Sequence, residues 1–258
     1  MMKEQTSPVV TVAEISRSYG RTQALEAVSF ALHPGELVAL LGENGAGKTT
    51  ALRVIAGLLS PDAGQIQGLG GRITWGSPSW KQFVGYLDEE PFLYETLSGF
   101  EFLELVGALH RLPRVLCQQR AGQLLAQLKL REVAQQRIQS YSQGMRRRLA
   151  LCSVLLHQPR LLLLDEPLNG LDPANVREVK GLLSQHCATG GAVLVSTHLL
   201  DVAERLCSRA IILSHGRLIA DGDLDELRRL ASKGADASLE AVFFALTVSG
   251  EEAARREQ

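Results

Sequence analysis

A glycine-rich segment that contains one lysine and one threonine has the spacing of a phosphate-binding loop. Residues 42–49 read Gly-Glu-Asn-Gly-Ala-Gly-Lys-Thr, which fits the pattern G-x-x-x-x-G-K-[ST]. Glycine lets consecutive backbone N–H groups turn toward phosphate oxygens, and the lysine can reach the β- and γ-phosphates of a nucleotide. A strand-to-helix turn that binds nothing is the alternative, but the lysine, the hydroxyl and the flanking sequence favour nucleotide binding. We predict contacts from Gly42, Glu43, Asn44, Gly45, Ala46, Gly47, Lys48, Thr49 and Thr50.

Two acidic residues, Asp165 and Glu166, directly follow the four leucines at residues 161–164. A continuous apolar run is typical of a strand buried on both faces, and side chains alternate along a strand, so the two carboxylates should diverge. We predict that Asp165, together with the Thr49 hydroxyl, binds Mg²⁺, and that Glu166 is the general base for a water molecule near the γ-phosphate. Without the upstream loop, two solvent-exposed acids at a strand end would be an equally good interpretation.

Short apolar runs separated by glycine and proline predict the strands and helices that position these residues. Strands are predicted at residues 9–15, 28–32, 36–41, 84–87, 161–164, 192–196, 210–213 and 218–220, and around Ile66. Helices are predicted at residues 49–58 and within 100–136, where Ala121, Leu124, Leu125 and Leu128 recur at helical spacing. After Ser142 helices and strands alternate, which predicts an α/β fold with a mostly parallel sheet.

The composition fits a globular chain and excludes several classes of function. The chain has 258 residues, of which 45% are hydrophobic and 21% charged, with a formal net charge of -1. This balance gives no basic surface for nucleic acid, so no nucleic-acid partner is expected. The four cysteines form no CxxC pair, which argues against a zinc site or a disulfide framework. No apolar run approaches the roughly 20 residues that span a bilayer.

A third motif narrows the family of nucleotide-binding proteins. Residues 141–145, Tyr-Ser-Gln-Gly-Met, resemble the signature motif LSGGQ of ABC ATPases and lie shortly before the acidic strand, as in that family. Residues 169–172 resemble its D-loop, Tyr19 the aromatic residue that stacks on adenine, and His198 the switch histidine. Six motifs in the family's order identify the chain as similar to the ATP-binding subunits of ABC transporters. The cofactors that this resemblance implies are ATP and Mg²⁺.

The resemblance implies both a fold and a composite active site. The fold is a P-loop NTPase core with a mostly parallel sheet, an N-terminal antiparallel β subdomain and an inserted α-helical subdomain. We assign residues 8–230 to the ATPase domain, with the helical subdomain at about 90–155, and residues 231–258 to a C-terminal helix and charged tail. Two ATPase subunits, identical or different, would pair head to tail. The catalytic residues Lys48, Glu166 and His198 would act within one subunit, while Ser142, Gln143 and Gly144 would contact the γ-phosphate from the other, with Asp172 in the D-loop.

The sequence departs from the family pattern at one position of the expected site. The family usually has glutamine in the loop before the helical subdomain, whereas Glu89 occupies that position here. A carboxylate can also bind Mg²⁺, so we include Glu89 among the metal ligands and predict an altered metal dependence. The signature departs as well, with Tyr141, Gln143 and Met145, but its serine and second glycine are present.

An aromatic segment after Glu89 predicts the contact with a membrane partner. Phe92, Leu93 and Tyr94 lie where ABC subunits receive the coupling helix of a polytopic membrane permease, so we predict that they line that groove. The signature, this loop and residues 238–247 resemble the branch that exports drugs, antibiotics, lipids and polysaccharides. The expected location is the cytoplasmic face of the inner membrane, peripheral through the permease. The alternative functions are an ABC ATPase acting on ribosomes or nucleic acid and an enzyme that phosphorylates a small substrate.

Overall fold

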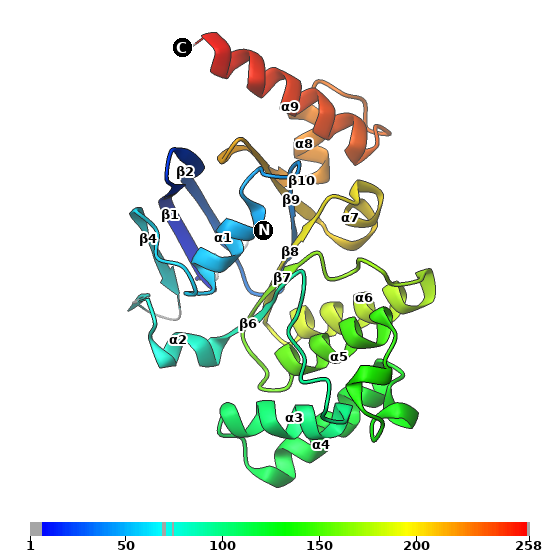
Figure 1. The fold of residues 1–258 in the computed structure, drawn as a ribbon. Helices are drawn as coiled ribbons and strands as arrows, with labels where there is room; N and C mark the ends of the chain where they lie inside the picture. The colour runs from blue at the N-terminus through cyan, green and yellow to red at the C-terminus, as the bar shows by residue number, and fades with distance from the viewer. Residues whose placement is uncertain (1–6, 69–70, 74, 257–258) are drawn as a thin grey trace.

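The computed structural model describes residues 7–68, 71–73 and 75–256, whose strands form two sheets. Figure 1 shows both sheets side by side, with helices around them. The larger sheet has six strands, in the order β10 (Arg217–Asp223), β9 (Arg209–Ser214), β3 (Leu37–Leu41), β8 (Ala192–Thr197), β7 (Leu161–Asp165) and β6 (Val84–Leu87). The smaller sheet has four, in the order β2 (Thr22–Leu32), β1 (Val10–Tyr19), β4 (Ala63–Gly68) and β5 (Gly71–Arg72).

Five strands of the larger sheet run parallel, and only β10 pairs antiparallel with its neighbour β9. Strands β3, β7 and β8 are buried along their whole length, as their continuous apolar sequences predict. Because the strands are parallel, the carboxyl ends of β3, β6, β7 and β8 meet at one edge of the sheet. The predicted site residues follow these ends, so the topology brings them together.

The smaller sheet is antiparallel and its first two strands are longer than the sequence predicted. Strands β1 and β2 form a hairpin that continues to the pair Tyr19 and Thr22, whereas strands were predicted only at residues 9–15 and 28–32. The register shifts inside this hairpin, where Glu14 and Ala27 adopt positive φ angles of 51° and 49°. Such bulges break the alternation of apolar and polar residues, which explains why the predicted strands were shorter than β1 and β2.

Helices cover the sheets and form a separate group at one end (Figure 1). Helices α1 (Lys48–Ile55), α2 (Pro78–Phe83), α6 (Pro173–Ala188) and α7 (Leu200–Leu206) lie beside the sheets. The chain between β6 and β7 forms α3 (Gly99–Leu109), α4 (Arg114–Gln127) and α5 (Gln143–Leu155), with short 3-10 helices η1 (Arg131–Val133) and η2 (Ile138–Ser140). The last two helices are α8 (Leu224–Leu230) and α9 (Leu239–Arg256).

The helical group has the buried face that its sequence spacing predicts. Ala121, Leu125 and Leu128 are at most 1% exposed, and Leu124 packs against the same core. Ser98 begins α3 with a capping box, since its hydroxyl accepts from the Glu101 N–H at 3.2 Å and the Glu101 carboxylate accepts from the Ser98 N–H at 2.8 Å. Such a cap contributes about 1 kcal/mol. The boundaries assigned to the ATPase domain and the helical subdomain remain predictions.

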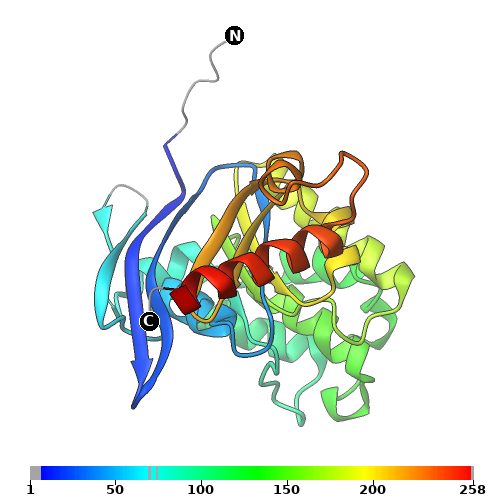
Figure 2. The same ribbon diagram turned by 90° about the horizontal axis from the view of Figure 1, so that it is seen from above.

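Helix α9 lies across the outside of the molecule, as Figure 2 shows. Its Leu239, Val242 and Phe243 are buried against the domain, where α9 contacts α7, α8 and β10. Of the tail predicted at residues 251–258, residues 257–258 lie outside the described part, and the rest continues α9. Within the described residues, no helix combines the length and apolar character that crossing a membrane requires.

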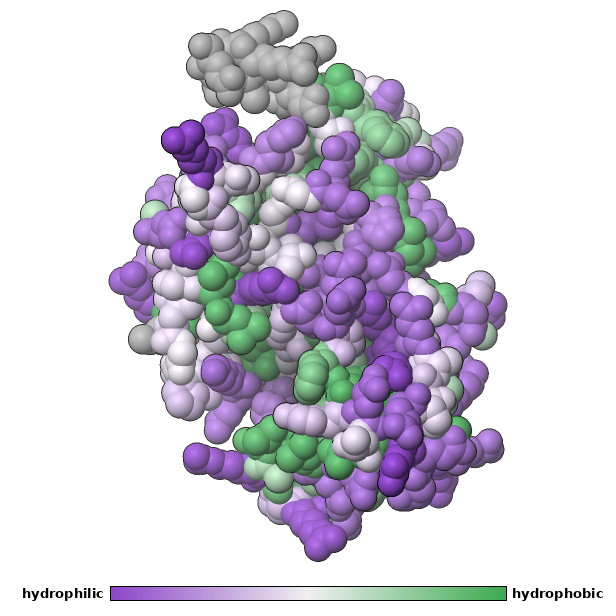
Figure 3. Space-filling view, viewed as in Figure 1, coloured by the Kyte–Doolittle hydropathy of each residue, from purple (hydrophilic) through white to green (hydrophobic). Residues whose placement is uncertain are grey.

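The architecture confirms the predicted fold class. A mostly parallel sheet, an antiparallel sheet from the N-terminal part of the chain and helices together match the α/β fold of a P-loop NTPase. Buried apolar residues form two clusters, one between the larger sheet and the helical group and one between the two sheets. On the surface, apolar residues gather over the lower part of the molecule in Figure 3, where α3 and α4 lie.

Candidate functional site

The phosphate-binding loop predicted at residues 42–49 joins the end of β3 to the start of α1. Gly45 and Gly47 have positive φ angles of 83° and 102°. A Cβ atom on Gly47 would lie 2.4 Å from the carbonyl oxygen of Ala24 in β2, whereas a Cβ atom on Gly45 would meet nothing within 4 Å. Glycine is therefore required at residue 47 by both conformation and space. The loop is packed against β2 on one side and open on the other.

The N-terminus of α1 presents backbone N–H groups to this open side. Gly47 is its N-cap residue, and no described side chain caps the helix there. The first N–H groups of a helix lack partners within it, and the helix dipole adds positive potential at that end. The start of α1 therefore has the properties of a phosphate site.

Lys48 lies at the base of the loop and is only 8% exposed. Its Nζ atom donates hydrogen bonds to the carbonyl oxygens of Gly42, at 2.7 Å, and Glu43, at 3.1 Å. Burial lowers the pKa of Lys48 from its ordinary value, although the Glu166, Asp165 and Glu89 carboxylates act in the opposite direction. A bound phosphate would add negative charge nearby and so favour the protonated ammonium.

Asp165 ends strand β7 and Glu166 follows it, and both are buried, with 1% and 6% exposure. Ser196 of β8 donates its hydroxyl to Asp165 Oδ1, and the same hydroxyl accepts the Glu166 N–H at 3.1 Å. The second oxygen, Asp165 Oδ2, is buried without a hydrogen-bond partner among the described residues. A buried carboxylate oxygen is costly in free energy unless a cation, a donor or ordered water meets it. Asp165 Oδ2 therefore remains available to a cation, a donor or ordered water.

Glu166 is held in an uncommon backbone conformation next to His198. Its φ angle is 45°, which costs a non-glycine residue about 1–3 kcal/mol, and its N–H is also accepted by the Ser196 carbonyl at 3.2 Å. Glu166 Oε1 lies 2.7 Å from Nδ1 of His198, whose side chain is 51% exposed. The buried carboxylate is thus fixed in place, with the histidine beside it at the solvent side.

A pocket of about 450 Å³ brings most of the predicted residues together. Its lining comes from the loop, both acidic residues, the histidine, the residue in place of glutamine and the N-terminal hairpin, namely Tyr19, Ala24, Asn44, Gly45, Gly47, Lys48, Thr49, Thr50, Glu89, Asp165, Glu166 and His198. Ala24 was not predicted. The predicted residues Gly42, Glu43 and Ala46 belong to the loop but do not line the pocket, and the first two hold Lys48 through their carbonyls.

Tyr19 provides an aromatic ring at this pocket. Its side chain is 48% exposed, and the guanidinium carbon of Arg17 lies 5.4 Å from the ring centroid. Both residues belong to β1 and lie close to the turn into β2. An exposed aromatic ring at a pocket edge can stack on a planar base.

Oxygen atoms in this pocket fit a magnesium ion. Thr49, Asp165 and Glu89 come from α1, the end of β7 and the loop after β6, and all three line the pocket. Hydroxyl and carboxylate oxygens are the ligands that Mg²⁺ prefers, and Asp165 Oδ2 is buried and unpartnered. The described residues contain no group of three His, Cys, Asp or Glu side chains close enough to hold a metal alone. This donor set suits Mg²⁺ that keeps water and phosphate ligands.

The signature residues Ser142, Gln143 and Gly144 lie outside the pocket. Ser142 is the N-cap of α5, and its hydroxyl accepts the Met145 N–H at 3.3 Å. A Cβ atom on Gly144 would lie 3.4 Å from the carbonyl oxygen of Gly170, so the start of α5 adjoins the predicted D-loop. The signature residues and the D-loop turn at Gly170 therefore lie next to each other, apart from the pocket that Lys48 lines.

Asp172 in the D-loop caps helix α6. Its Oδ1 atom accepts the N–H groups of Ala174 and Asn175 at 3.0 and 2.9 Å, and these hydrogen bonds lower the pKa of Asp172. Like the signature residues, Asp172 does not line the pocket. The pocket and the two helix starts are thus distinct parts of the same molecule.

The aromatic segment at residues 92–94 is exposed only in part. Phe92 and Tyr94 are 78% and 50% exposed, and their rings meet edge to face with centroids 5.1 Å apart. Leu93, by contrast, is 8% exposed and belongs to the hydrophobic core. That all three side chains line a groove remains a prediction, and Leu93 exposes much less surface to such a groove than its two neighbours. Leu93 anchors the segment, and Phe92 with Tyr94 forms its exposed surface.

Two arginines near the pocket were missed by the sequence analysis. Arg53 of α1 pairs with Asp88 at 3.1 Å. Arg147 of α5 is 6% exposed and donates to the Asp88 carbonyl at 3.4 Å. Burial lowers the pKa of Arg147, while the carboxylates of Glu89, Glu166, Asp165 and Asp88 raise it. Arg147 stands within a run of three arginines, and the sequence offers no signal that distinguishes the buried one.

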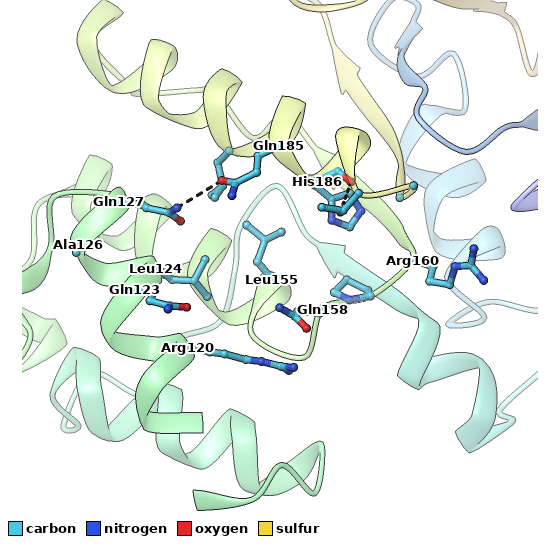
Figure 4. Close-up of a pocket in the computed structure, with 15 residues that line it drawn as sticks. Arg120, Gln123, Leu124, Ala126, Gln127, Leu155, Gln158, Arg160, Gln185 and His186 are labelled. Carbon is cyan, nitrogen blue, oxygen red and sulfur yellow. Dashed lines mark hydrogen bonds between the residues drawn. The ribbon is translucent and has the colours of Figure 1, made fainter. Parts of the chain in front are cut away.

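A larger cavity, of about 820 Å³, opens elsewhere, between α4, the end of α5 and the end of α6 (Figure 4). Four of its fifteen lining residues are glutamines, and Gln127 Nε2 donates to Gln185 Oε1 at 3.4 Å. Arg120 also lines the cavity and donates to the Leu156 carbonyl at 3.3 Å. None of the predicted site residues lines this cavity.

Comparison with known families and proteins identifies similar ATP-binding proteins. The family model described as ABC transporter matches residues 25–169. The chain is 40% identical over 224 residues to an uncharacterized ABC transporter ATP-binding protein, YxlF of Bacillus subtilis (strain 168), covering 86% of this chain and 73% of that protein. It is 37% identical over 227 residues to the daunorubicin resistance ATP-binding protein DrrA3 of Streptomyces coeruleorubidus, covering 88% of this chain and 71% of that protein.

A solved structure agrees with the fold described above. The structure described as the ATP binding subunit of an ABC transporter superposes with a TM-score of 0.86 at 34% sequence identity. The match covers 93% of this chain and 99% of the other. Both sheets and the helical group thus have counterparts in a single known chain.

Proposed function

The chain belongs to the ATP-binding proteins of the ABC transporter family, and from this premise we propose how its residues bind and hydrolyse ATP and how it joins a transporter. It is an ATP-binding and ATP-hydrolysing subunit that drives transport. The alternative of an ABC ATPase acting on ribosomes or nucleic acid is not favoured, because the relatives are transporter subunits. A single observation carries the residue assignments: the loop, the acidic pair and the histidine line one pocket.

Within this pocket, we assign the phosphates to the loop and the start of α1, and the adenine to Tyr19. The N–H groups around Gly45 and Gly47 and the Lys48 ammonium would hold the β- and γ-phosphates. Thr49, Asp165 and Glu89 would hold Mg²⁺, which when bound offsets negative charge on the phosphates. The unpartnered Asp165 Oδ2 supports this assignment.

Glu166 would accept the proton of the attacking water. A general base must reach the proton that it removes, and the Glu166 carboxylate is fixed at the pocket by its backbone hydrogen bonds and by His198. Because His198 is more exposed than Glu166, it can contact the γ-phosphate while staying next to the base. Loss of the γ-phosphate would then remove a contact of His198, which is hydrogen-bonded to Glu166. His198 would in this way act as a switch.

A second ATPase subunit would complete the site. Ser142, Gln143, Gly144 and Asp172 lie outside the pocket, at two helix starts. Helix starts favour anions, so the start of α5 is suited to a γ-phosphate that it cannot reach within its own subunit. We therefore infer a head-to-tail pair in which each ATP lies between the loop of one subunit and the signature of the other.

The membrane partner would be a polytopic permease at the cytoplasmic face of the inner membrane, and transport would be export. The similarity to a daunorubicin resistance protein supports export of a drug or antibiotic. The exposed pair Phe92 and Tyr94 offers an apolar contact for a helix of that permease.

Nucleotide retention tests the assignment of ATP and magnesium together. Purified protein should bind ATP at least about tenfold more tightly with Mg²⁺ than with EDTA, because the pocket carries three carboxylates that repel an uncompensated triphosphate. Equilibrium dialysis with labelled ATP measures both affinities. Equal retention with and without Mg²⁺ would contradict the metal assignment, and no retention in either condition would contradict the nucleotide site.

Alanine substitution of both Phe92 and Tyr94 tests the permease contact. We expect co-purification with the permease to fall by about tenfold or more, since exposed aromatic anchors carry much of the binding energy of an interface. The matched control is the double substitution Phe244→Ala and Val248→Ala, which removes a comparably exposed apolar pair, 53% and 56%, from α9. Equal recovery of the permease by the two double variants would rule out the assigned contact.

A further inference from the structure

Arg147 is a buried cation beside the nucleotide pocket that the reaction scheme above does not use. It lies in α5, five residues after the N-cap Ser142, and is 6% exposed. Arginine stays protonated in proteins, and a buried charge is costly in free energy unless other charges compensate it. Its guanidinium donates to the Asp88 carbonyl at 3.4 Å, and within the described residues it makes no direct ion pair. Its compensation must therefore come from charges somewhat farther away.

Those charges are the carboxylates of the pocket. Glu89 follows Asp88, whose carbonyl accepts from Arg147, and Glu89 lines the pocket together with Glu166 and Asp165. These three carboxylates act electrostatically on both Arg147 and Lys48, and Asp88 acts on Arg147 as well. Lys48 and Arg147 thus share one set of anions, Lys48 from the loop and Arg147 from α5. With glutamine at residue 89, the two cations would share two carboxylates of the pocket. With glutamate there, they share three.

The loop that carries Glu89 is also attached to both helices that flank it. The Asp88 carboxylate pairs with Arg53 of α1 at 3.1 Å and accepts the Tyr86 hydroxyl at 3.2 Å, while the Asp88 carbonyl accepts from Arg147. The loop therefore links the helix that starts at the phosphate loop to the helix that starts at the signature. A charge at residue 89 can act on both.

We propose that Arg147 is a positioning residue that compensates the carboxylate of Glu89, so that these two side chains form a functional pair between the signature helix and the nucleotide pocket. This rests on the proposed function of the pocket. Loss of Arg147 would leave three carboxylates around a triphosphate with one cation, and would weaken nucleotide binding. Loss of Glu89 at the same time would restore the balance between carboxylates and cations.

A double-mutant cycle on the full chain tests the pair. The probe is the Mg²⁺ complex of an ATP analogue with a nitrogen bridge between the β- and γ-phosphorus atoms, so that equilibrium affinity is measured without hydrolysis. We expect Arg147→Gln to weaken binding by about tenfold in the parent. Glu89→Gln changes the affinity by its own amount as a pocket residue, but in the Glu89→Gln background the further loss from Arg147→Gln should fall below about threefold. Arg147→Lys, which keeps the charge, should stay within about threefold of the parent. Thermal unfolding of each variant checks the fold. If Arg147→Gln does not fold, the affinity of Arg147→Lys, with and without Glu89→Gln, provides the test.

Three results would overturn the pair. Independent effects of Glu89→Gln and Arg147→Gln would show no coupling, and normal affinity of Arg147→Gln would show that only the hydrogen bond to Asp88 matters. A loss in Arg147→Lys as large as in Arg147→Gln would also exclude compensation by charge. The matched control is Arg148→Met, because Arg148 donates to the Gly144 and Leu128 carbonyls and not toward the pocket, so it should show no coupling with Glu89→Gln. If the parent itself does not bind the probe, the proposed function fails rather than this pair.

Discussion

Replacing Glu166 by glutamine should lower the rate of ATP hydrolysis by about 10²–10⁴-fold, because the amide cannot accept the proton of the attacking water. The substitution preserves size, and the amide oxygen can still accept a hydrogen bond from His198 where the carboxylate now does, 2.7 Å away. The affinity for Mg²⁺ and ATP should therefore change by less than about threefold. Phosphate release at saturating ATP and equilibrium binding of ATP, measured on the same preparation, separate the two effects.

Glu240→Gln is the matched control for this prediction, since it makes the same chemical change at an exposed position on α9. It should leave both hydrolysis and affinity unchanged. A Glu166→Gln variant that hydrolyses ATP at the parent rate would show that another group is the base. A variant that has lost ATP binding as well would show that Glu166 stabilises the fold or holds the metal instead. This is the main competing interpretation, because Glu166 is buried, with 6% exposure.

Much of the fold was predictable because its strands are buried on both faces. The runs that became β3, β7 and β8 are apolar throughout, and the structure buries each of them completely. Helix α4 was equally clear from its spacing. The long β1–β2 hairpin was only half predicted, because bulges at Glu14 and Ala27 interrupt its alternation and its outer part is exposed.

The candidate site was predictable where chemistry and chain order coincide. The loop, the acidic pair and His198 each follow a strand of the larger sheet. Predicting those parallel strands therefore predicted that these residues lie close together at one edge of the sheet. Arg147 and Arg53 could not be found in this way. Both arginines contact Asp88, and the sequence does not show which faces of α1 and α5 meet that residue. Three consecutive arginines at residues 146–148 also do not reveal which one is buried. The burial of Leu93 was not predictable for a similar reason, because a short apolar segment does not show which of its side chains faces the core.

Replacing Lys48 by alanine should reduce hydrolysis by about a hundredfold or more. Among the described residues that line the pocket, Lys48 is the only lysine, so the substitution removes the ammonium that would contact the phosphates. Replacing Gly144 by aspartate should have a comparable effect for a different reason. A carboxylate at the start of α5 would repel the γ-phosphate, although the Gly144 position has room for a Cβ atom, 3.4 Å from the nearest carbonyl oxygen. Each variant alone should therefore be folded and almost inactive as an ATPase, which thermal unfolding and phosphate release would show.

Mixing the two inactive variants distinguishes a composite site from a self-contained one. In a head-to-tail pair formed by one Lys48→Ala subunit and one Gly144→Asp subunit, both defects fall in the same site and the other site is intact. Random pairing then leaves about one quarter of all sites intact, so hydrolysis should reappear on mixing, with that fraction as its upper limit. If each subunit completed its own site, every site in the mixture would carry a defect and no activity would return. Recovery therefore tests whether the signature residues of one chain reach the pocket of another, as we propose from their position outside their own pocket.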